Sequence, residues 1–239
     1  MNAEENAALV LSGGLGSRMG TQVPKQYQTI AGKPVLVHTI EQFQRCGAVR
    51  YVAVVAAEEW HGQILRWKAE FGLSKLEALA PAGEDRQRSI LNGLRGLRPF
   101  LTGARDGVIV QDAARPLTSG TLIGGLLQGL REAPCVLPVM PVTDTTYTSR
   151  DGRWVDGLLD RAALYSGQAP EAFHYQDYLR LYEQTPPEVL GTLSGSCQLP
   201  YSRGWKVKMI PGERDNIKIT YPSDLEMCER LLREREAAR

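Results

Sequence analysis

Apolar runs and helical patterns alternate along the first 140 residues of this 239-residue chain. Short β-branched runs at residues 7–11, 51–57, 107–112 and 135–142 have the composition of strands buried on both faces. Between them, residues 34–46, 58–71, 85–97 and 119–132 have helical character, with apolar residues three or four apart in the clearest cases. This alternation predicts an α/β fold, a Rossmann-like, mostly parallel sheet with helices on both faces.

The pattern changes after Val142. Two strand-like runs flank Asp151-Gly152, a dipeptide typical of hairpin turns, so residues 143–165 are predicted to form an inserted β-arm that pairs two subunits. Residues 201–220 predict a strand, a turn and a second short strand. The last helix is expected to begin with a capping box between Ser223 and Glu226. With no internal repeat or low-complexity linker, residues 1–239 are expected to form a single domain.

Composition excludes several classes of function. The net charge of +1 gives no general attraction for nucleic acid or anionic membrane. Four cysteines without CxxC spacing and three histidines without a metal-ligand spacing argue against disulfide frameworks and zinc sites. The start, MNAEENAALVLSGG, has no basic region before its short apolar run. We therefore expect a cytoplasmic enzyme that binds neither membrane nor nucleic acid.

The loop after the first strand, LSGGLGSRMGTQVPKQY, is rich in glycine and carries Arg18 and Lys25. It lacks the Gly-Lys-Ser/Thr of a P-loop, and both the third glycine and the later acid of a dinucleotide fingerprint are missing. An NAD-dependent dehydrogenase is therefore disfavoured. Backbone N–H groups of residues 12–16 and two cations suit a phosphate chain. The alternative is a glycine turn beside solvated charges.

Three further segments carry candidate polar residues. Asp112 ends a predicted central strand, where it can hold Mg²⁺ facing a triphosphate or cap the next helix. GEDRQRS, at 83–89, can bind a ligand or cap the helix that follows it. RDNIKIT, at 214–220, supplies Asp215 and Lys218, of which the lysine can also be an edge-strand charge. Because ligands of such sheets bind at the carboxyl ends of the strands, the glycine loop, Asp112 and the PVTDT turn are expected to converge.

Six segments together resemble one family. LSGGLGSRMGTQVPKQY, GEDRQRS, QDAARP, PVTDT, LLDRAALYSGQAPEAF and DNIKIT occur in this order over nearly the whole chain. They are similar to the 2-C-methyl-D-erythritol 4-phosphate cytidylyltransferases and to the closely similar ribitol-5-phosphate cytidylyltransferases. The resemblance implies that the α/β fold is of nucleotidyltransferase type. It also implies transfer of CMP from CTP to a polyol phosphate, with release of pyrophosphate and Mg²⁺ as cofactor, in a homodimer.

The resemblance also implies roles for individual residues. Arg18, Lys25 and Lys218 would stabilise the α-phosphate, and Asp112, with Asp215 as a second candidate, would bind the metal. Thr145 and Arg161 would hold the polyol phosphate, Arg161 in the neighbour's site. The triphosphate loop and the cytidine contacts would be supplied by Ser12, Gly13, Gly14, Gly16, Gly83, Glu84, Arg86 and Ser89.

The chain departs from the family in two places. Ala169-Pro170-Glu171 stands where methylerythritol enzymes usually carry Thr-Pro-Gln, and Gly195 lies near the place of an acid. Leu-Tyr-Ser-Gly-Gln resembles the ribitol type, whereas Asp-Ala-Ala-Arg-Pro resembles the methylerythritol type, which we favour. A sugar-1-phosphate enzyme that uses UTP or GTP and a nucleotide-binding protein without catalysis are less favoured hypotheses.

Overall fold

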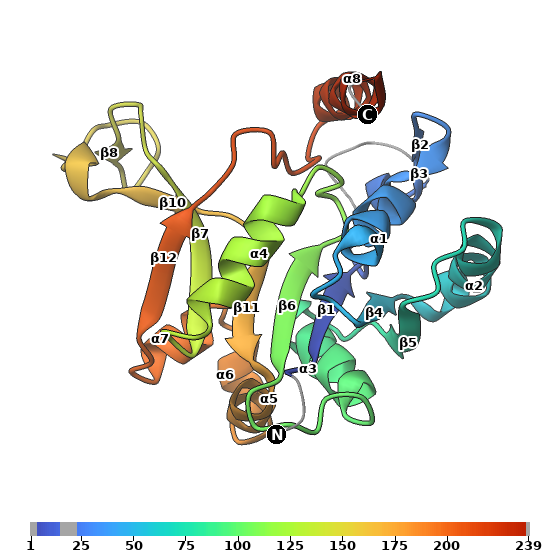
Figure 1. Cartoon of the computed structure of the whole chain (residues 1–239). Helices are drawn as coiled ribbons and strands as arrows, with labels where there is room; N and C mark the ends of the chain where they lie inside the picture. Colours follow the sequence, from blue (N-terminus) through green and yellow to red (C-terminus); the bar gives the residue numbers. More distant parts are fainter. Residues whose placement is uncertain (1–3, 15–22, 238–239) are drawn as a thin grey trace.

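A mixed, mostly parallel sheet forms the centre of the computed structural model, which describes residues 4–14 and 23–237 (Figure 1). Its strand order is β10-β7-β11-β6-β1-β4-β5, and β12 also pairs with β7. Only β10 and β11 run against the other strands. The eight strands are β1 (Asn6–Leu11), β4 (Tyr51–Ala56), β5 (Leu76–Pro81), β6 (Gly107–Asp112), β7 (Cys135–Pro141), β10 (Tyr165–Gly167), β11 (Glu171–His174) and β12 (Val207–Pro211). The α/β fold expected from the sequence is confirmed.

Helices cover both faces of this sheet, because the central strand β1 is apolar on both sides. Ala8 and Val10 pack in a cluster with α1 (Val35–Arg45), α2 (His61–Glu70) and α4 (Gly120–Gly129). Ala7 and Leu9 pack in a second cluster with α3 (Arg86–Leu97) and α5 (Tyr175–Glu183). A Cβ on Gly93 of α3 would lie 2.2 Å from Leu9 Cδ1, so glycine is needed for this close packing.

A third apolar cluster fixes α8 (Pro222–Ala237) against the short hairpin of β2 (Thr29–Ile30) and β3 (Lys33–Pro34). Two short helices, α6 (Pro187–Leu190) and α7 (Gln198–Ser202), lie with α5 on the side of the sheet opposite α4. Within residues 4–14 and 23–237, no helix combines the length and the apolar character needed to cross a membrane.

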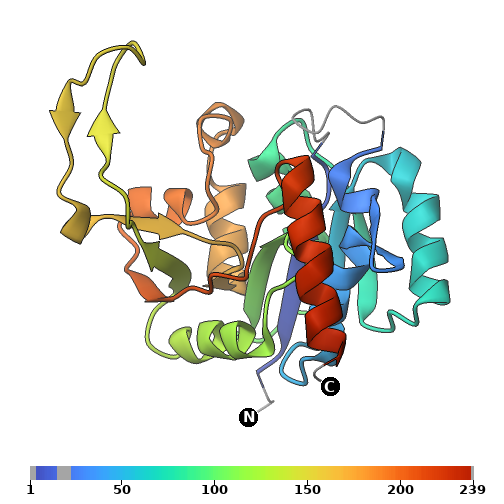
Figure 2. The ribbon, with the colours of Figure 1, turned by 90° about the horizontal axis from the view of Figure 1, so that it is seen from above.

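The predicted arm projects from the body of the molecule (Figure 2). Its strands β8 (Tyr147–Thr148) and β9 (Gly157–Leu158) pair antiparallel. At the turn, Gly152 has a φ of +70°, and Asp151 Oδ1 accepts hydrogen bonds from the backbone N–H groups of Arg153 and Trp154. The Asp-Gly dipeptide thus forms the turn that the sequence predicts.

The structure corrects two details of the carboxyl-terminal part. The second short strand expected in residues 214–220 is absent from the described chain, although Ile219 N–H donates to Ala114 O. The capping box also differs: α8 begins at Pro222, one residue before Ser223, and Asp224 Oδ2 accepts from the N–H groups of Thr220 and Tyr221, both at 2.8 Å. Asp224 therefore caps the helix in place of Glu226.

Candidate functional site

A cavity of about 460 Å³ lies at the carboxyl ends of β1 and β6, at the upper edge of the sheet in Figure 1. This is the edge at which parallel α/β sheets bind ligands. The cavity is lined by Leu11, Gly13, Gly14, Lys25, Gln26, Gly83, Glu84, Asp85, Arg86, Ser89, Asp112, Ala113, Ala114 and Lys218. Most of the candidate residues that the sequence offers in distant segments are therefore brought together here.

The glycine loop after β1 forms one wall. Gln26 fixes this loop, since Gln26 Nε2 donates to Ser12 O at 2.9 Å and to Gly14 O at 2.7 Å. Ser12 is buried and its hydroxyl donates to Tyr27 Oη, so Ser12 supports the loop without lining the cavity. A Cβ on Gly13 would lie 2.7 Å from Ala82 Cβ. The predictions for Gly16 and Arg18 fall outside the described residues.

The start of α3 forms the opposite wall. Asp85 caps this helix by accepting from Arg88 N–H at 2.8 Å. Ser89 Oγ accepts from Gly83 N–H and donates to Asp85 O, which closes a tight turn that a Cβ on Gly83 would disrupt. The expected capping of α3 is confirmed, and the segment also lines the cavity, where its binding of a ligand stays a prediction. Glu84 is exposed at the rim, where it pairs with Arg88 at 3.2 Å.

Asp112 is the charged centre of the cavity. Lys218 Nζ lies 2.8 Å from its Oδ2, Arg86 Nη2 lies 3.4 Å from its Oδ1, and Arg115 Nε lies 3.7 Å from its Oδ2. Burial alone would raise the pKa of Asp112, but the positive charges of Arg86, Lys218 and Arg115 outweigh it and lower the pKa to about 2. Three cations thus gather around this carboxylate, and cations are what a polyphosphate ligand requires.

Asp215 lies apart from this cluster. Its carboxylate pairs with Arg235 of α8 at 3.6 Å, and it does not line the cavity. Among the described residues, no group of three or more histidine, cysteine or acidic side chains is placed to hold a metal ion. Asp112 alone still fits Mg²⁺, because this ion is commonly held by one or two carboxylates together with substrate phosphates.

The predicted polyol-phosphate residues lie on the arm. Arg161 Nη1 donates to Thr143 O at 2.8 Å, and neither Thr145 nor Arg161 lines the cavity of its own chain. The PVTDT turn expected at the ligand edge therefore leads into the arm.

Sequence reasoning missed two kinds of residue. Gln26 and Asn216 hold the loops that line the cavity, and both lie in segments quoted for the resemblance, with nothing to mark them as supports. Glu171 and Ser196 lie near Arg86. In the sequence, Glu171 stands out only as a departure from the family's usual residue. Nothing in the local sequence around Ser196 indicates a role for it.

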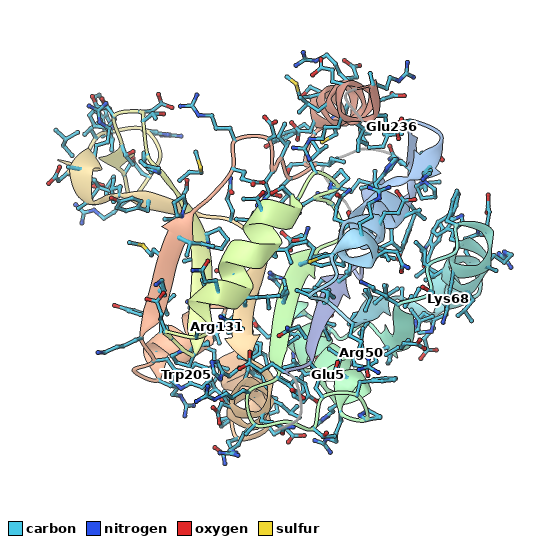
Figure 3. The ribbon with its side chains drawn as sticks, viewed as in Figure 1. Glu5, Arg50, Lys68, Arg131, Trp205 and Glu236 are labelled. Atoms are coloured by element: carbon cyan, nitrogen blue, oxygen red, sulfur yellow. The ribbon has the colours of Figure 1, made fainter. Side chains whose placement is uncertain are left out.

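A larger hollow of about 960 Å³ lies at the opposite edge, at the amino ends of β1 and β4. Figure 3 shows Glu5, Arg50 and Arg131 near this lower edge. Glu5 and Arg50 pair with each other at 2.5 Å, and no glycine-rich loop borders the hollow in the described chain. The smaller cavity is therefore the better candidate.

Comparison with known proteins gives consistent matches over nearly the whole chain. A family model described as 2-C-methyl-D-erythritol 4-phosphate cytidylyltransferase matches residues 7–234. Proteins of this name from Rubrobacter xylanophilus and Cereibacter sphaeroides are 39% and 35% identical to the chain. The first match covers 96% of this chain and 95% of the relative, and the second covers 95% and 96%. A solved structure titled 4-diphosphocytidyl-2C-methyl-D-erythritol synthase superposes with a TM-score of 0.80 at 25% identity, over 97% of this chain and all of the other. The matched range includes every residue that lines the cavity.

Proposed function

Since this chain belongs to the 2-C-methyl-D-erythritol 4-phosphate cytidylyltransferase family, we propose that it transfers CMP from CTP to 2-C-methyl-D-erythritol 4-phosphate and releases pyrophosphate. This reaction serves isoprenoid precursor synthesis. The observation that carries the proposal is the convergence of a glycine loop, Lys25, Lys218 and the start of α3 around Asp112 in one cavity.

The reaction needs no protein nucleophile. A phosphate oxygen of the acceptor attacks the α-phosphorus of CTP and forms the new P–O bond. The bond from the α-phosphorus to the oxygen that bridges to the β-phosphorus breaks, and pyrophosphate leaves with that electron pair. The protein positions the two phosphates and neutralises their charge. Lys25 and Lys218 line the cavity and are suited to this task.

The remaining wall residues suit the nucleoside. Ser89 and the backbone at Gly83 lie together at the start of α3, next to Arg86. We assign cytosine and ribose to this wall and the triphosphate to the backbone around Gly13 and Gly14, near the lysines.

Mg²⁺ is the proposed cofactor, and it would be held by Asp112 together with the triphosphate. When bound, it would neutralise part of the charge on the phosphates. The low pKa of Asp112 keeps the carboxylate ionised throughout the neutral range. Asp215 is not proposed as a metal ligand, because its carboxylate pairs with Arg235 of α8.

A homodimer paired through residues 143–165 is the proposed assembly. Trp154 is 78% exposed and Leu158 is 67% exposed on the arm, and a hairpin this short is marginally stable by itself. A second subunit would cover these side chains and would bring Thr145 and Arg161 to the neighbouring cavity.

Pyrophosphate release tests the proposal. The protein is incubated with Mg²⁺, with CTP, UTP or GTP, and with methylerythritol phosphate or ribitol phosphate in parallel. We expect release with CTP and methylerythritol phosphate. Release with ribitol phosphate alone would assign the other acceptor, and CTP binding without release would indicate a protein that has lost catalysis.

A further inference from the structure

A second carboxylate, that of Glu171, lies near Arg86 outside the lining of the cavity. Glu171, the first residue of β11, is 8% exposed and does not line the cavity. Its Oε2 lies 4.0 Å from Arg86 Nη2, an atom that also lies 3.4 Å from Asp112 Oδ1 and donates to Ser196 Oγ at 3.0 Å. One guanidinium nitrogen thus faces acceptors from β6, from β11 and from the loop before α7.

Burying the ionised carboxylate of Glu171 is energetically unfavourable. Its Oε2 has no hydrogen-bond partner among the described residues, and burial raises the pKa of Glu171 even though Ser196 and Arg86 oppose the rise. A neutral side chain of similar size would avoid this cost. The acid of this chain, at a position where related enzymes usually carry glutamine, is therefore better explained by its effect on Arg86 than by stability.

The loop that carries Ser196 is fixed to the helix that carries Arg86. Tyr178 Oη donates to Ser196 O at 3.1 Å, and Gln87 Nε2 donates to Leu193 O and to Gly195 O, both at 3.2 Å. Tyr182 Oη donates to Gln87 Oε1. Because Ser196 Oγ accepts from Arg86 Nη2 and Glu171 Oε2 lies 4.0 Å from the same nitrogen, the three side chains form one connected cluster.

We propose that Glu171 and Ser196 are positioning residues that hold the guanidinium of Arg86, so that Arg86 keeps a counterion when Asp112 would hold the metal beside the bound nucleotide. The inference rests on the proposed CTP site. Without Glu171, Asp112 is the only carboxylate left beside Arg86 in the described chain. Asp112 then stays paired with Arg86, and CTP binds less tightly.

A double-mutant cycle on CTP affinity tests the proposal, because coupling between two residues appears as non-additivity. Calorimetry measures the Kd of CTP, with Mg²⁺ and without any acceptor, for the wild type, Glu171→Gln, Arg86→Ala and the double variant. We expect Glu171→Gln to raise the Kd about tenfold in the wild-type background, and less than about twofold when Arg86 is already alanine. Ser196→Ala should weaken CTP binding in the same direction and should be non-additive with Glu171→Gln.

Glu41→Gln is the matched control. Glu41 is another buried glutamate, 9% exposed and paired with Arg45 at 2.6 Å on α1, but it does not line the cavity. Its replacement should leave the Kd of CTP within about twofold of the wild-type value. Thermal unfolding shows that each variant is folded, and Ser196→Ala carries the test if Glu171→Gln does not fold.

An unchanged or lower Kd in Glu171→Gln would overturn the proposal, as would an equal loss in the Arg86→Ala background. These outcomes are distinct from a failure of the proposed function. A wild-type protein that binds CTP but releases no pyrophosphate with any acceptor contradicts the assigned reaction and leaves the cycle measurable.

Discussion

Lys218 reaches the cavity because Asn216, two residues earlier, is fixed by three hydrogen bonds to two other parts of the chain. Asn216 Nδ2 donates to Ala169 O at 2.7 Å, Thr118 Oγ1 donates to Asn216 Oδ1, and Arg115 Nη1 donates to Asn216 O. An irregular segment is thereby held beside the end of β6. A lysine could be proposed here from the sequence, but the partners that fix its position lie about 50 to 100 residues away.

Replacing Lys218 by alanine should lower kcat about 100- to 1,000-fold, the range measured when one charge-stabilising group is removed from an active site. The side chain is 44% exposed, so the unfolding temperature should change little. Steady-state pyrophosphate release and a melting curve check this prediction. Lys68→Ala on α2 is the control and should keep full activity, because Lys68, labelled in Figure 3, does not line the cavity. Near-normal turnover in Lys218→Ala would remove the lysine from the mechanism.

Glu171 should make stability depend on pH in an unusual direction. Because its pKa is higher in the folded than in the unfolded protein, the folded state binds the proton more tightly, and stability falls as the pH rises through the folded pKa. Glu171→Gln should therefore raise the melting temperature at pH 8, by a few degrees, and this gain should shrink as the pH is lowered toward 5. Melting curves of both proteins across this range test the prediction. A variant less stable than the wild type at pH 8 would show that the ionised carboxylate stabilises the fold.

At the scale of elements, the sequence predicted the strands with strong local patterns. β1, β4, β6 and β7 are continuous apolar runs, and all four lie where they were expected. β5 was missed because LEALAP, at the edge of the sheet, contains a charge and a proline. β11 was missed because it has four residues and is defined by its pairing with β6 and β7. The strand expected in residues 214–220 was wrong. Ile217 and Ile219 pack in the third apolar cluster, against α8, so their alternation reflects burial of the two side chains and not hydrogen bonding to a neighbouring strand.

The arm supplies a prediction at this scale. Leu158→Glu should convert the proposed homodimer into a monomer, because it places a charge on an apolar surface that we expect to be covered. Sedimentation velocity at micromolar concentration measures the change, and activity should fall with it if Arg161 acts in the neighbouring site. Leu65→Glu is the matched control, since Leu65 is also exposed, at 54%, but lies on α2. A wild-type protein that sediments as a monomer would contradict the pairing.

For the molecule as a whole, the position of the cavity could be predicted from the sequence, but the residues that support its walls could not. The carboxyl ends of parallel strands meet at one edge, so the glycine loop and Asp112 could be placed together from their order along the chain. Glu171 and Ser196 are 25 residues apart and approach Arg86 only after β11 inserts antiparallel between β6 and β7. No local pattern encodes that insertion.

Phosphorus NMR of a reaction that contains CTP, Mg²⁺, methylerythritol phosphate and the protein tests the central claim most directly, because it identifies which phosphate groups are joined and which are released. We expect the acceptor's phosphate signal to be replaced by a pair of coupled diphosphate signals, with an equal amount of free pyrophosphate. Unchanged CTP, or CTP hydrolysed while the acceptor phosphate stays intact, would contradict the proposed reaction.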